Sequence, residues 1–201
     1  MKVIMWDVDD VLNDLMGEWL RSKWLPMHPK CPVDYQGISV NPPHELLGVD
    51  KREYLDSLDA FRNNSFRALK PIPEMLEWFR LHGRKAEHIV VTSVPVLAAH
   101  HSAEWVFTHF GEWVRSFNIV PSPREGSRDH GATSKSDFIR IFSKVDVVVE
   151  DNLETIRSMR EMDLSTVTIP RPWNDSRQTL ESTLNGLTKL VTDKSTRRRT
   201  L

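Results

Sequence analysis

Three aspartates, Asp7, Asp9 and Asp10, stand within four positions near the start of the chain, directly after the apolar run 3–6. This pattern predicts a short buried strand that ends in a cluster of negative charge. Carboxylates this close either raise one another's pKa or are held ionised by a cation, and a divalent ion that prefers oxygen ligands suits them. Because side chains alternate along an extended chain, Asp7 and Asp9 point to the same side. The alternative interpretation is an Asp-rich turn or helix cap after a strand.

Polar side chains also follow two later apolar runs, at residues 88–91 and 145–149. They are Thr92, Ser93, Glu150 and Asp151, and Lys135 begins the helix expected before the second run. Ligands of parallel sheets bind where the carboxyl ends of the strands meet the loops. Carboxylates for a magnesium ion, hydroxyls and amides for phosphate oxygens, and one fixed cation together describe a phosphoryl-transfer site.

The elements that would position these residues alternate between strand and helix after Gly83. Strands are expected at 88–91, 117–120, 145–149 and 166–169, and helices at 101–110, 134–143, 153–162 and 176–191. Together with the first strand, this alternation predicts an α/β fold, a Rossmann-like parallel sheet flanked by helices. Right-handed crossover connections leave few topologies for such a sheet.

The chain between the first two strands carries helical patterns and turn residues but no strand signal. Helices are expected at 13–25, 50–62 and 74–82, and the stretch 26–43 holds five prolines and is expected to be a loop. Because a simple crossover needs far fewer residues, we expect a small helical insert at 14–69. Residues 1–13 and 70–201 would then form the core domain.

The bulk composition excludes several classes of protein. The 201 residues carry a formal net charge of −1, which provides no overall field for a nucleic acid or a membrane surface. The single cysteine, Cys31, excludes an internal disulfide and a thiolate metal site. With no apolar run of membrane-spanning length and no signal peptide pattern, we expect a cytoplasmic protein without nucleic acid or membrane partners.

The acidic cluster and the later strand ends occur in the order of four short motifs. These are 7–11 (Asp-Val-Asp-Asp-Val), 90–93 (Val-Val-Thr-Ser), Lys135, and 148–152 (Val-Val-Glu-Asp-Asn). They resemble the motifs of haloacid dehalogenase (HAD) superfamily phosphatases, which place a cap between the first two. Within the superfamily the chain is most similar to the cytosolic 5′(3′)-deoxyribonucleotidase group, through several further stretches. These are Phe66 with 69–73, 92–95, 105–111 and 172–174.

The resemblance implies a role for each matching residue. Asp7 is expected to be the nucleophile that forms an aspartyl-phosphate, and Asp9 the acid that protonates the leaving oxygen and then deprotonates water. Asp7, the backbone carbonyl of Asp9 and Asp151 are expected to bind Mg²⁺, which screens the nucleophile from the phosphate. Thr92 would bind a phosphate oxygen, and Lys135 would neutralise charge on the nucleophile and the phosphate.

The chain departs from the family pattern at two positions. The fourth motif usually ends in two aspartates, but here Glu150 precedes Asp151, so Glu150 is expected to act in the outer shell or through water. Asp10 stands where many relatives have glycine, and its role stays open. The third-motif lysine is expected to be Lys135 at the start of its helix rather than Lys144 at the far end.

Substrate contacts are expected from residues near the motifs and in the insert. Ser93 follows Thr92, and Phe66 and Tyr35 lie outside the clearest helical patterns. Nucleotidases hold a base between aromatic side chains, so Phe66 and Tyr35 are the candidates for that contact, although aromatic residues are more often core. The late segment 172–174 is expected either to line the rim of the site or to form a turn with a packed indole.

The motifs predict a Mg²⁺-dependent phosphatase that acts on a small phosphorylated substrate, and the resemblance implies that this substrate is a deoxyribonucleoside 5′-monophosphate. One rival substrate is a sugar phosphate, and another is the 3′-phosphate of a nucleic acid end. A phosphorelay receiver also combines acidic residues, Thr or Ser and Lys, but its acidic pair would come first and its phosphorylated Asp on a later strand. A catalytically silent binding domain of the same fold is the remaining alternative.

Overall fold

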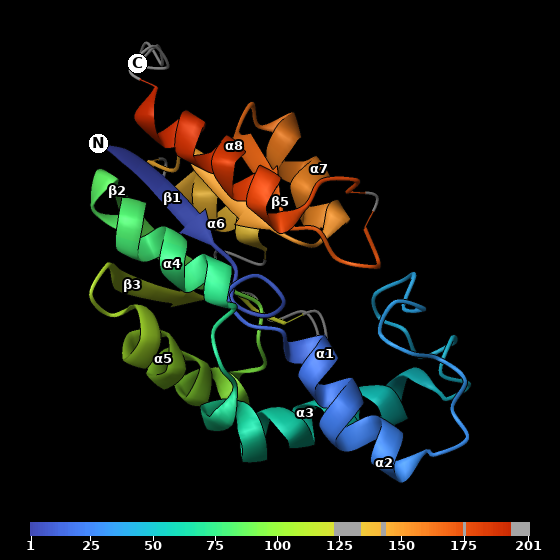
Figure 1. Ribbon diagram of the computed structural model, residues 1–201. Helices are drawn as coiled ribbons and strands as arrows, with labels where there is room; N and C mark the ends of the chain where they lie inside the picture. The colour runs from blue at the N-terminus through green and yellow to red at the C-terminus, as the bar shows by residue number, and fades with distance from the viewer. Residues whose placement is uncertain (123–133, 142–143, 175, 194–201) are drawn as a thin grey trace.

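A five-stranded parallel sheet forms the centre of the molecule. The computed structural model describes residues 1–122, 134–141, 144–174 and 176–193. The sheet has the order β3-β2-β1-β4-β5, and all its neighbouring strands run parallel (Figure 1). The strands are β1 (Lys2–Trp6), β2 (Ala86–Thr92), β3 (Val114–Ile119), β4 (Val147–Glu150) and β5 (Ser165–Thr168). The chain therefore starts in the middle of the sheet, and the carboxyl ends of β1, β2 and β4 lie side by side.

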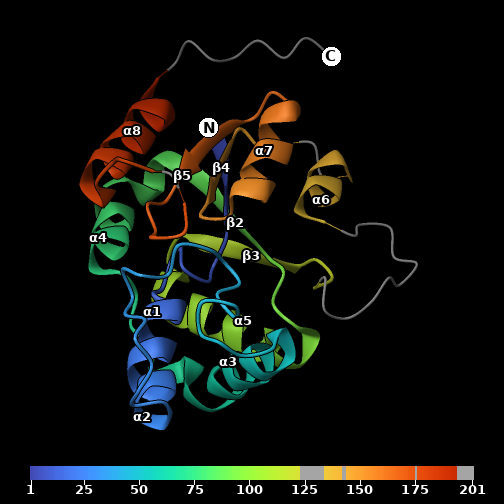
Figure 2. The same ribbon diagram turned by 90° about the vertical axis from the view of Figure 1, so that its right-hand side faces the viewer.

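Helices cover both faces of this sheet (Figure 2). One face carries α4 (Pro73–His82), α5 (Val96–Phe110) and α8 (Leu180–Thr192), and the other carries α6 (Lys135–Ile141) and α7 (Leu153–Glu161). Side chains along β1 point alternately to the two faces of the sheet. Ile4 and Trp6 therefore pack in the core cluster under α4 and α8, and Met5 packs in the cluster under α6 and α7. Burial on both faces explains why the central strands read as continuous apolar runs.

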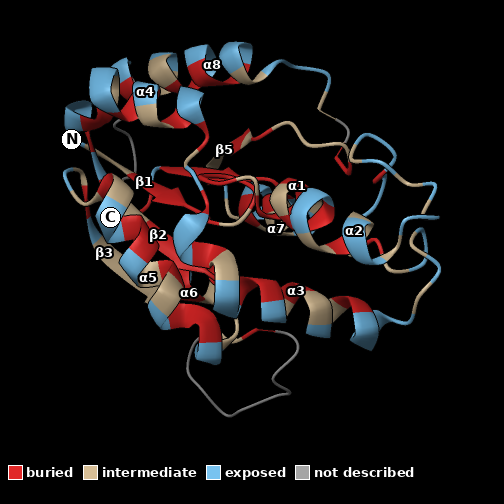
Figure 3. Ribbon diagram, turned by 60° about the horizontal axis from the view of Figure 1, so that its bottom comes forward, coloured by how far each residue is buried: buried red, intermediate tan, exposed pale blue. Residues whose placement is uncertain are grey.

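A group of helices between β1 and β2 extends beyond the carboxyl ends of the strands (Figure 1). They are α1 (Leu15–Trp19), a π-helical segment (Leu20–Trp24), α2 (Leu25–Met27), α3 (Lys51–Ser65) and a short 3-10 helix (Phe66–Ala68). α3 is buried on the face that carries Tyr54, Leu58 and Arg62 and exposed on the other (Figure 3), whereas α1 has no exposed residue and α2 no buried one. Trp19 packs against Trp24 and, edge-on, against Tyr54, so aromatic side chains hold α1 to α3.

The predicted fold class is confirmed. The helix predicted at 13–25 is divided by the π-helical segment Leu20–Trp24, and the other differences lie at the ends of elements. β3 begins three residues earlier than the predicted 117–120. The prediction missed its start because β3 is an edge strand, and its polar residues Arg115 and Ser116 interrupt the apolar pattern of a strand. α5 begins at Val96, directly after Pro95, and not at His101, since proline favours the start of a helix. α8 begins at Leu180 rather than 176, after Thr179 caps it by accepting a hydrogen bond from the Ser182 amide.

Some expectations fall on residues that the structure does not describe. The loop expected before the predicted helix 134–143 includes 123–133, and the last two residues of that helix, 142 and 143, also lie outside the described part. None of the helices in the described ranges is both long enough and apolar enough to cross a membrane.

Candidate active site

A cavity of about 490 Å³ opens over the carboxyl ends of β1, β2 and β4. The strand ends and the helix α6 bring most of the predicted chemical residues to its wall. These are Asp7, Asp9, Thr92, Ser93, Lys135, Glu150 and Asp151. Residues that are far apart in the sequence therefore meet in one place, because the acids and hydroxyls end or follow parallel strands and Lys135 begins the helix α6.

Asp7 and Lys135 form a buried ion pair at the floor of the cavity. The amide of Asp7 donates to the carbonyl of Val149 (3.1 Å), which extends the pairing of β1 with β4 and fixes the nucleophile candidate. Lys135 Nζ lies 2.7 Å from Asp7 Oδ1 and 2.7 Å from Glu150 Oε2. Burial opposes the charge on Lys135, but the Asp7 and Glu150 carboxylates outweigh it and raise the lysine pKa above its ordinary value. The lysine is therefore a fixed cation between two carboxylates.

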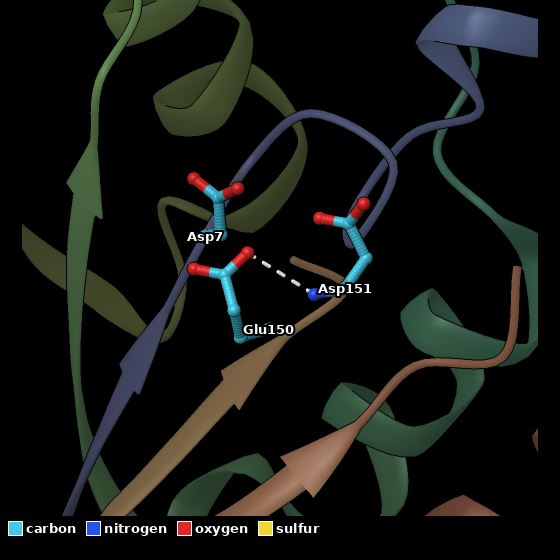
Figure 4. A group of neighbouring side chains, drawn as sticks. All are labelled: Asp7, Glu150 and Asp151. Atoms are coloured by element: carbon cyan, nitrogen blue, oxygen red, sulfur yellow. Dashed lines mark hydrogen bonds between the residues drawn. The ribbon is translucent and has the colours of Figure 1, made fainter. Parts of the chain in front are cut away.

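The carboxylates of Asp7, Glu150 and Asp151 converge beyond the ends of β1 and β4 (Figure 4). One oxygen of each lies within 4.8 Å of the others. Burial and the charge of Glu150 raise the pKa of Asp7 to about 7, and burial and the charges of Asp10 and Asp7 raise that of Asp151 to about 7. Three buried acids facing one lysine leave excess negative charge, which a divalent cation with oxygen ligands would balance.

Glu150 has its own partners within this cluster. Its Oε2 accepts from Lys135, and its Oε1 accepts from the amides of Asp151 (3.1 Å) and Asn152 (3.2 Å). The longer side chain of glutamate thus folds back onto the turn that follows β4. These contacts occupy both oxygens of Glu150, whereas the Asp151 carboxylate lies near those of Asp10 and Asp7.

The segment after β5 supports Asp151 from behind. Trp173 Nε1 donates to Asp151 Oδ2 (2.8 Å), and Asn174 Nδ2 donates to the carbonyls of Asp151 (3.0 Å) and Ile169 (2.9 Å). The two alternatives for residues 172–174 were the rim of the site and a packed turn. The structure shows the turn with a packed indole, and the buried indole also orients a carboxylate of the site.

Arg171, in the same segment, holds the acidic loop. Its Nε donates to the carbonyl of Asp10 (2.6 Å), and its NH2 group donates to the carbonyl of Asn13 (3.2 Å). Asp10 has a left-handed backbone with φ of 59°, and its carboxylate accepts from the amide of Met16 (2.9 Å). Asp10 therefore shapes the turn between β1 and α1, a contribution that the sequence left open.

The remaining predicted residues divide between the cavity and the core. Thr92 and Ser93 line the cavity, whereas Lys144 is exposed and makes no ion pair with Asp7. Phe66 is buried edge-on against Trp105, and it is not among the residues that line the cavity. Tyr35 stands edge-on against Trp173 and accepts from Arg171 (3.3 Å), also outside the lining.

Neither ring lines the cavity, so its geometry does not support the expected substrate contacts of Phe66 and Tyr35. The 3-10 helix 66–68 turns the Phe66 ring toward α5, and the Arg171 guanidinium holds Tyr35 behind the acidic loop. Both aromatic rings are used for packing, which is the more common role of such residues.

Sequence reasoning missed Arg62, which reaches the site from the last turn of α3. The residue is 6% exposed, lines the cavity, and contacts Asp9 and Asp59 through its guanidinium. Its position carried a signal, because Arg62 lies four residues after Leu58 and eight after Tyr54, on the buried face of the helix. A charged residue at a core position of an amphipathic helix usually has a buried partner.

The walls of the cavity differ in polarity. Leu15 and Met16 from α1 and Leu55 and Leu58 from α3 contribute apolar side chains, and α3 also contributes Lys51 and Arg62. A second group of lining residues comes from the start of α6 and from α7 and is rich in hydroxyl and amide groups. It consists of Ser134, Ser136, Asn152, Glu154, Thr155 and Ser158.

Comparison with known proteins assigns the fold. No protein-family model and no curated protein matches the chain. Among solved structures, a predicted phosphatase from Clostridium acetobutylicum has a TM-score of 0.58 at 15% identity, covering 94% of this chain and 96% of that one. A HAD family hydrolase from Deinococcus radiodurans with bound phosphate and sodium has a TM-score of 0.53 at 14% identity (96% and 98% covered). A haloacid dehalogenase-like hydrolase from Streptococcus pneumoniae has 0.55 at 13% (92% and 90%). The chain therefore has the HAD-like α/β fold.

Proposed function

We propose that the protein is a Mg²⁺-dependent phosphatase that hydrolyses a small phosphate monoester through an aspartyl-phosphate on Asp7. The proposal rests on one observation above all, the buried Lys135 ammonium 2.7 Å from Asp7 Oδ1 at the floor of the cavity. A carboxylate that attacks a phosphate ester brings two anions together, and a fixed cation beside the attacking oxygen offsets their repulsion. Asp9, on the wall of the same cavity, supplies the proton-transfer group.

The reaction proceeds in two displacements at phosphorus. First, a carboxylate oxygen of Asp7 bonds to phosphorus while the bond to the ester oxygen breaks, and Asp9 gives its proton to that departing oxygen. Next, water attacks phosphorus, Asp9 takes a proton from the water, and the bond to Asp7 breaks to release orthophosphate. Thr92 binds a phosphate oxygen through its hydroxyl, and Lys135 stabilises the negative charge on the phosphoryl group throughout.

The acidic cluster fits a divalent cation. Its donors are all oxygens, they lie within 4.8 Å of one another, and they are buried. Asp7 and Asp151 would hold Mg²⁺ together with the backbone carbonyl of Asp9, while Glu150 stays an outer partner because Lys135 and two backbone amides occupy its oxygens. The bound ion supplies positive charge that lowers the repulsion between nucleophile and phosphate.

The shape and polarity of the cavity favour a nucleoside 5′-monophosphate as the substrate. A nucleoside has a flat apolar face and a polar edge, and the cavity offers apolar side chains from α1 and α3 together with hydroxyl groups from α6 and α7. A volume of about 490 Å³ is in the range of small-molecule sites. A sugar phosphate is polar on all sides, so these apolar side chains would face it without benefit.

A phosphate-release assay tests the proposal. Purified protein with Mg²⁺ is given deoxyribonucleoside 5′-monophosphates, nucleoside 3′-phosphates, hexose phosphates and an aryl phosphate. We expect release to be fastest from the 5′-monophosphates and to disappear in Asp7→Asn. If none of the panel is hydrolysed, the enzyme assignment is wrong and a silent binding domain becomes the better description. Full turnover by Asp7→Asn would mean that the nucleophile is another residue.

A further inference from the structure

A buried arginine from the helical segment between β1 and β2 reaches across the cavity to Asp9. Arg62 donates to Asp9 Oδ2 through both Nε (3.2 Å) and NH2 (2.8 Å). Its remaining terminal nitrogen, NH1, donates to Asp59 Oδ1 (2.8 Å) one turn earlier on α3. The side chains of Arg62 and Asp9 are 8% and 15% exposed. Little solvent competes for these bonds, so the contact is more persistent than a surface ion pair.

The contact treats the two carboxylate oxygens of Asp9 differently. Oδ2 accepts both bonds from Arg62, whereas Oδ1 is buried and accepts no hydrogen bond from the described residues. A buried oxygen without a partner is unfavourable, so its retention beside the nucleophile calls for an explanation. Asp9 and Asp7 line the same cavity, where a reacting ester oxygen would be the missing partner.

We propose that Arg62 is a positioning residue that presents Asp9 Oδ1 to the oxygen of the leaving group. This inference rests on the proposed phosphatase function. Arginine carries only donors and stays protonated. Oδ2 already accepts two of its N–H groups, so Oδ1 is the oxygen of Asp9 that is left to face the leaving group. As the ester bond breaks in the proposed reaction, the proton that Asp9 gives passes from Oδ1 to the leaving oxygen, and Arg62 holds the resulting carboxylate in place for the second displacement.

Asp59 gives the arrangement its electrical balance. Its carboxylate shares the Arg62 charge, so the guanidinium faces two acids and does not act on Asp9 alone. The two N–H groups of the guanidinium thereby fix the orientation of the Asp9 carboxylate, while Asp59 reduces the effect of the arginine charge on Asp9. The contact also joins α3 to the turn after β1, so a purely structural tie is the competing explanation.

The leaving group of the substrate separates the two explanations. An alkyl phosphate has a poor leaving oxygen that needs a proton, whereas para-nitrophenyl phosphate releases a stable anion and needs little acid assistance. General acid catalysis contributes about 10²–10⁴-fold to rate. In Arg62→Met we expect kcat/KM for a nucleoside 5′-monophosphate or another alkyl phosphate to fall by about 100-fold, and that for para-nitrophenyl phosphate by less than about fivefold. Arg62→Lys keeps the charge and should recover part of the alkyl activity.

Two further variants complete the test. Arg52→Met removes an exposed arginine from the same helix, whose side chain is 90% exposed, and should leave both substrates unaffected. In a background of Asp9→Asn, Arg62→Met should have little additional effect on the alkyl phosphate, because Arg62 acts through Asp9. Wild-type protein that hydrolyses neither substrate would contradict the proposed function itself.

Other results would refute the positioning role of Arg62 while leaving the proposed phosphatase function intact. Equal losses on both substrates in folded Arg62→Met, or no loss on either, would leave Arg62 as a structural tie. If Arg62→Met does not fold, the same comparison of substrates is made with Arg62→Lys, and equal effects on the two substrates would again refute the role. A loss confined to the alkyl phosphate supports it.

Discussion

The hydrogen bond from Trp173 to Asp151 offers a sensitive test of how the site is held together. Trp173→Phe removes the indole N–H while keeping an aromatic ring in a position that is 8% exposed. In the native protein Nε1 lies 2.8 Å from Asp151 Oδ2 and stabilises the ionised carboxylate. A hydrogen bond to a charged group contributes about 1.5–3 kcal/mol. Since tenfold in affinity corresponds to about 1.4 kcal/mol, Mg²⁺ should bind roughly 10–100-fold more weakly.

Titration calorimetry with Mg²⁺, without any substrate, measures this effect directly. Trp78→Phe is the matched control, because Trp78 is also a buried tryptophan and donates to Thr188 Oγ1 (2.9 Å) on α8, away from the cavity. We expect the control to bind Mg²⁺ like the wild type even if its unfolding temperature falls. Unchanged or tighter Mg²⁺ binding by folded Trp173→Phe would refute the reasoning, and tighter binding would mean that the indole competes with the ion for Oδ2.

Other perturbations test the charges around and behind the site. Lys135→Met leaves buried carboxylates without a cation, so it should lower the free energy of unfolding of the metal-free protein by about 3–5 kcal/mol in urea. It should also slow phosphate release about 10²–10³-fold. Lys144→Met, at an exposed position, should do neither. Mg²⁺ should raise the unfolding temperature over an EDTA control more at pH 8 than at pH 5, because Asp7 and Asp151, with pKa values of about 7, bind protons at the lower pH; an equal rise at both would contradict this. Burial lowers the pKa of His88 below its ordinary 6.5. The neutral imidazole therefore contributes to stability above pH 6.5, and this contribution is lost as the pH falls and the unfolded state binds a proton more readily. His88→Gln should make the free energy of unfolding decline less between pH 7.5 and 5.

The excess negative charge at the strand ends is the feature that unites these tests. Asp7, Glu150 and Asp151 are buried within 4.8 Å of one another, and Lys135 is their neighbouring cation. Backbone amides and the Trp173 indole supply the remaining stabilisation of these carboxylates. Such an arrangement is unfavourable for folding alone, which is typical of groups kept for binding and catalysis.

The sequence by itself determined the fold class and the strand ends that meet at the cavity. Strands buried on both faces leave apolar runs that can be read directly, and a parallel sheet brings their carboxyl ends together whatever the loops do. For this reason Asp7, Thr92, Lys135 and Asp151 could be predicted to converge, and the start of α6 favoured Lys135 over Lys144 for a reason that depends only on position along a helix.

Only the tertiary structure decided which other side chains reach those residues. Arg62 and Trp173 contact Asp9 and Asp151 across 53 and 22 positions of sequence, and no local period or spacing encodes such a pairing. The same limit applies to Phe66, because the sequence does not distinguish an aromatic ring that enters a cavity from one that packs in the core. Apolar periodicity reports which face of an element is buried, but the direction of a side chain depends on how separate elements pack together.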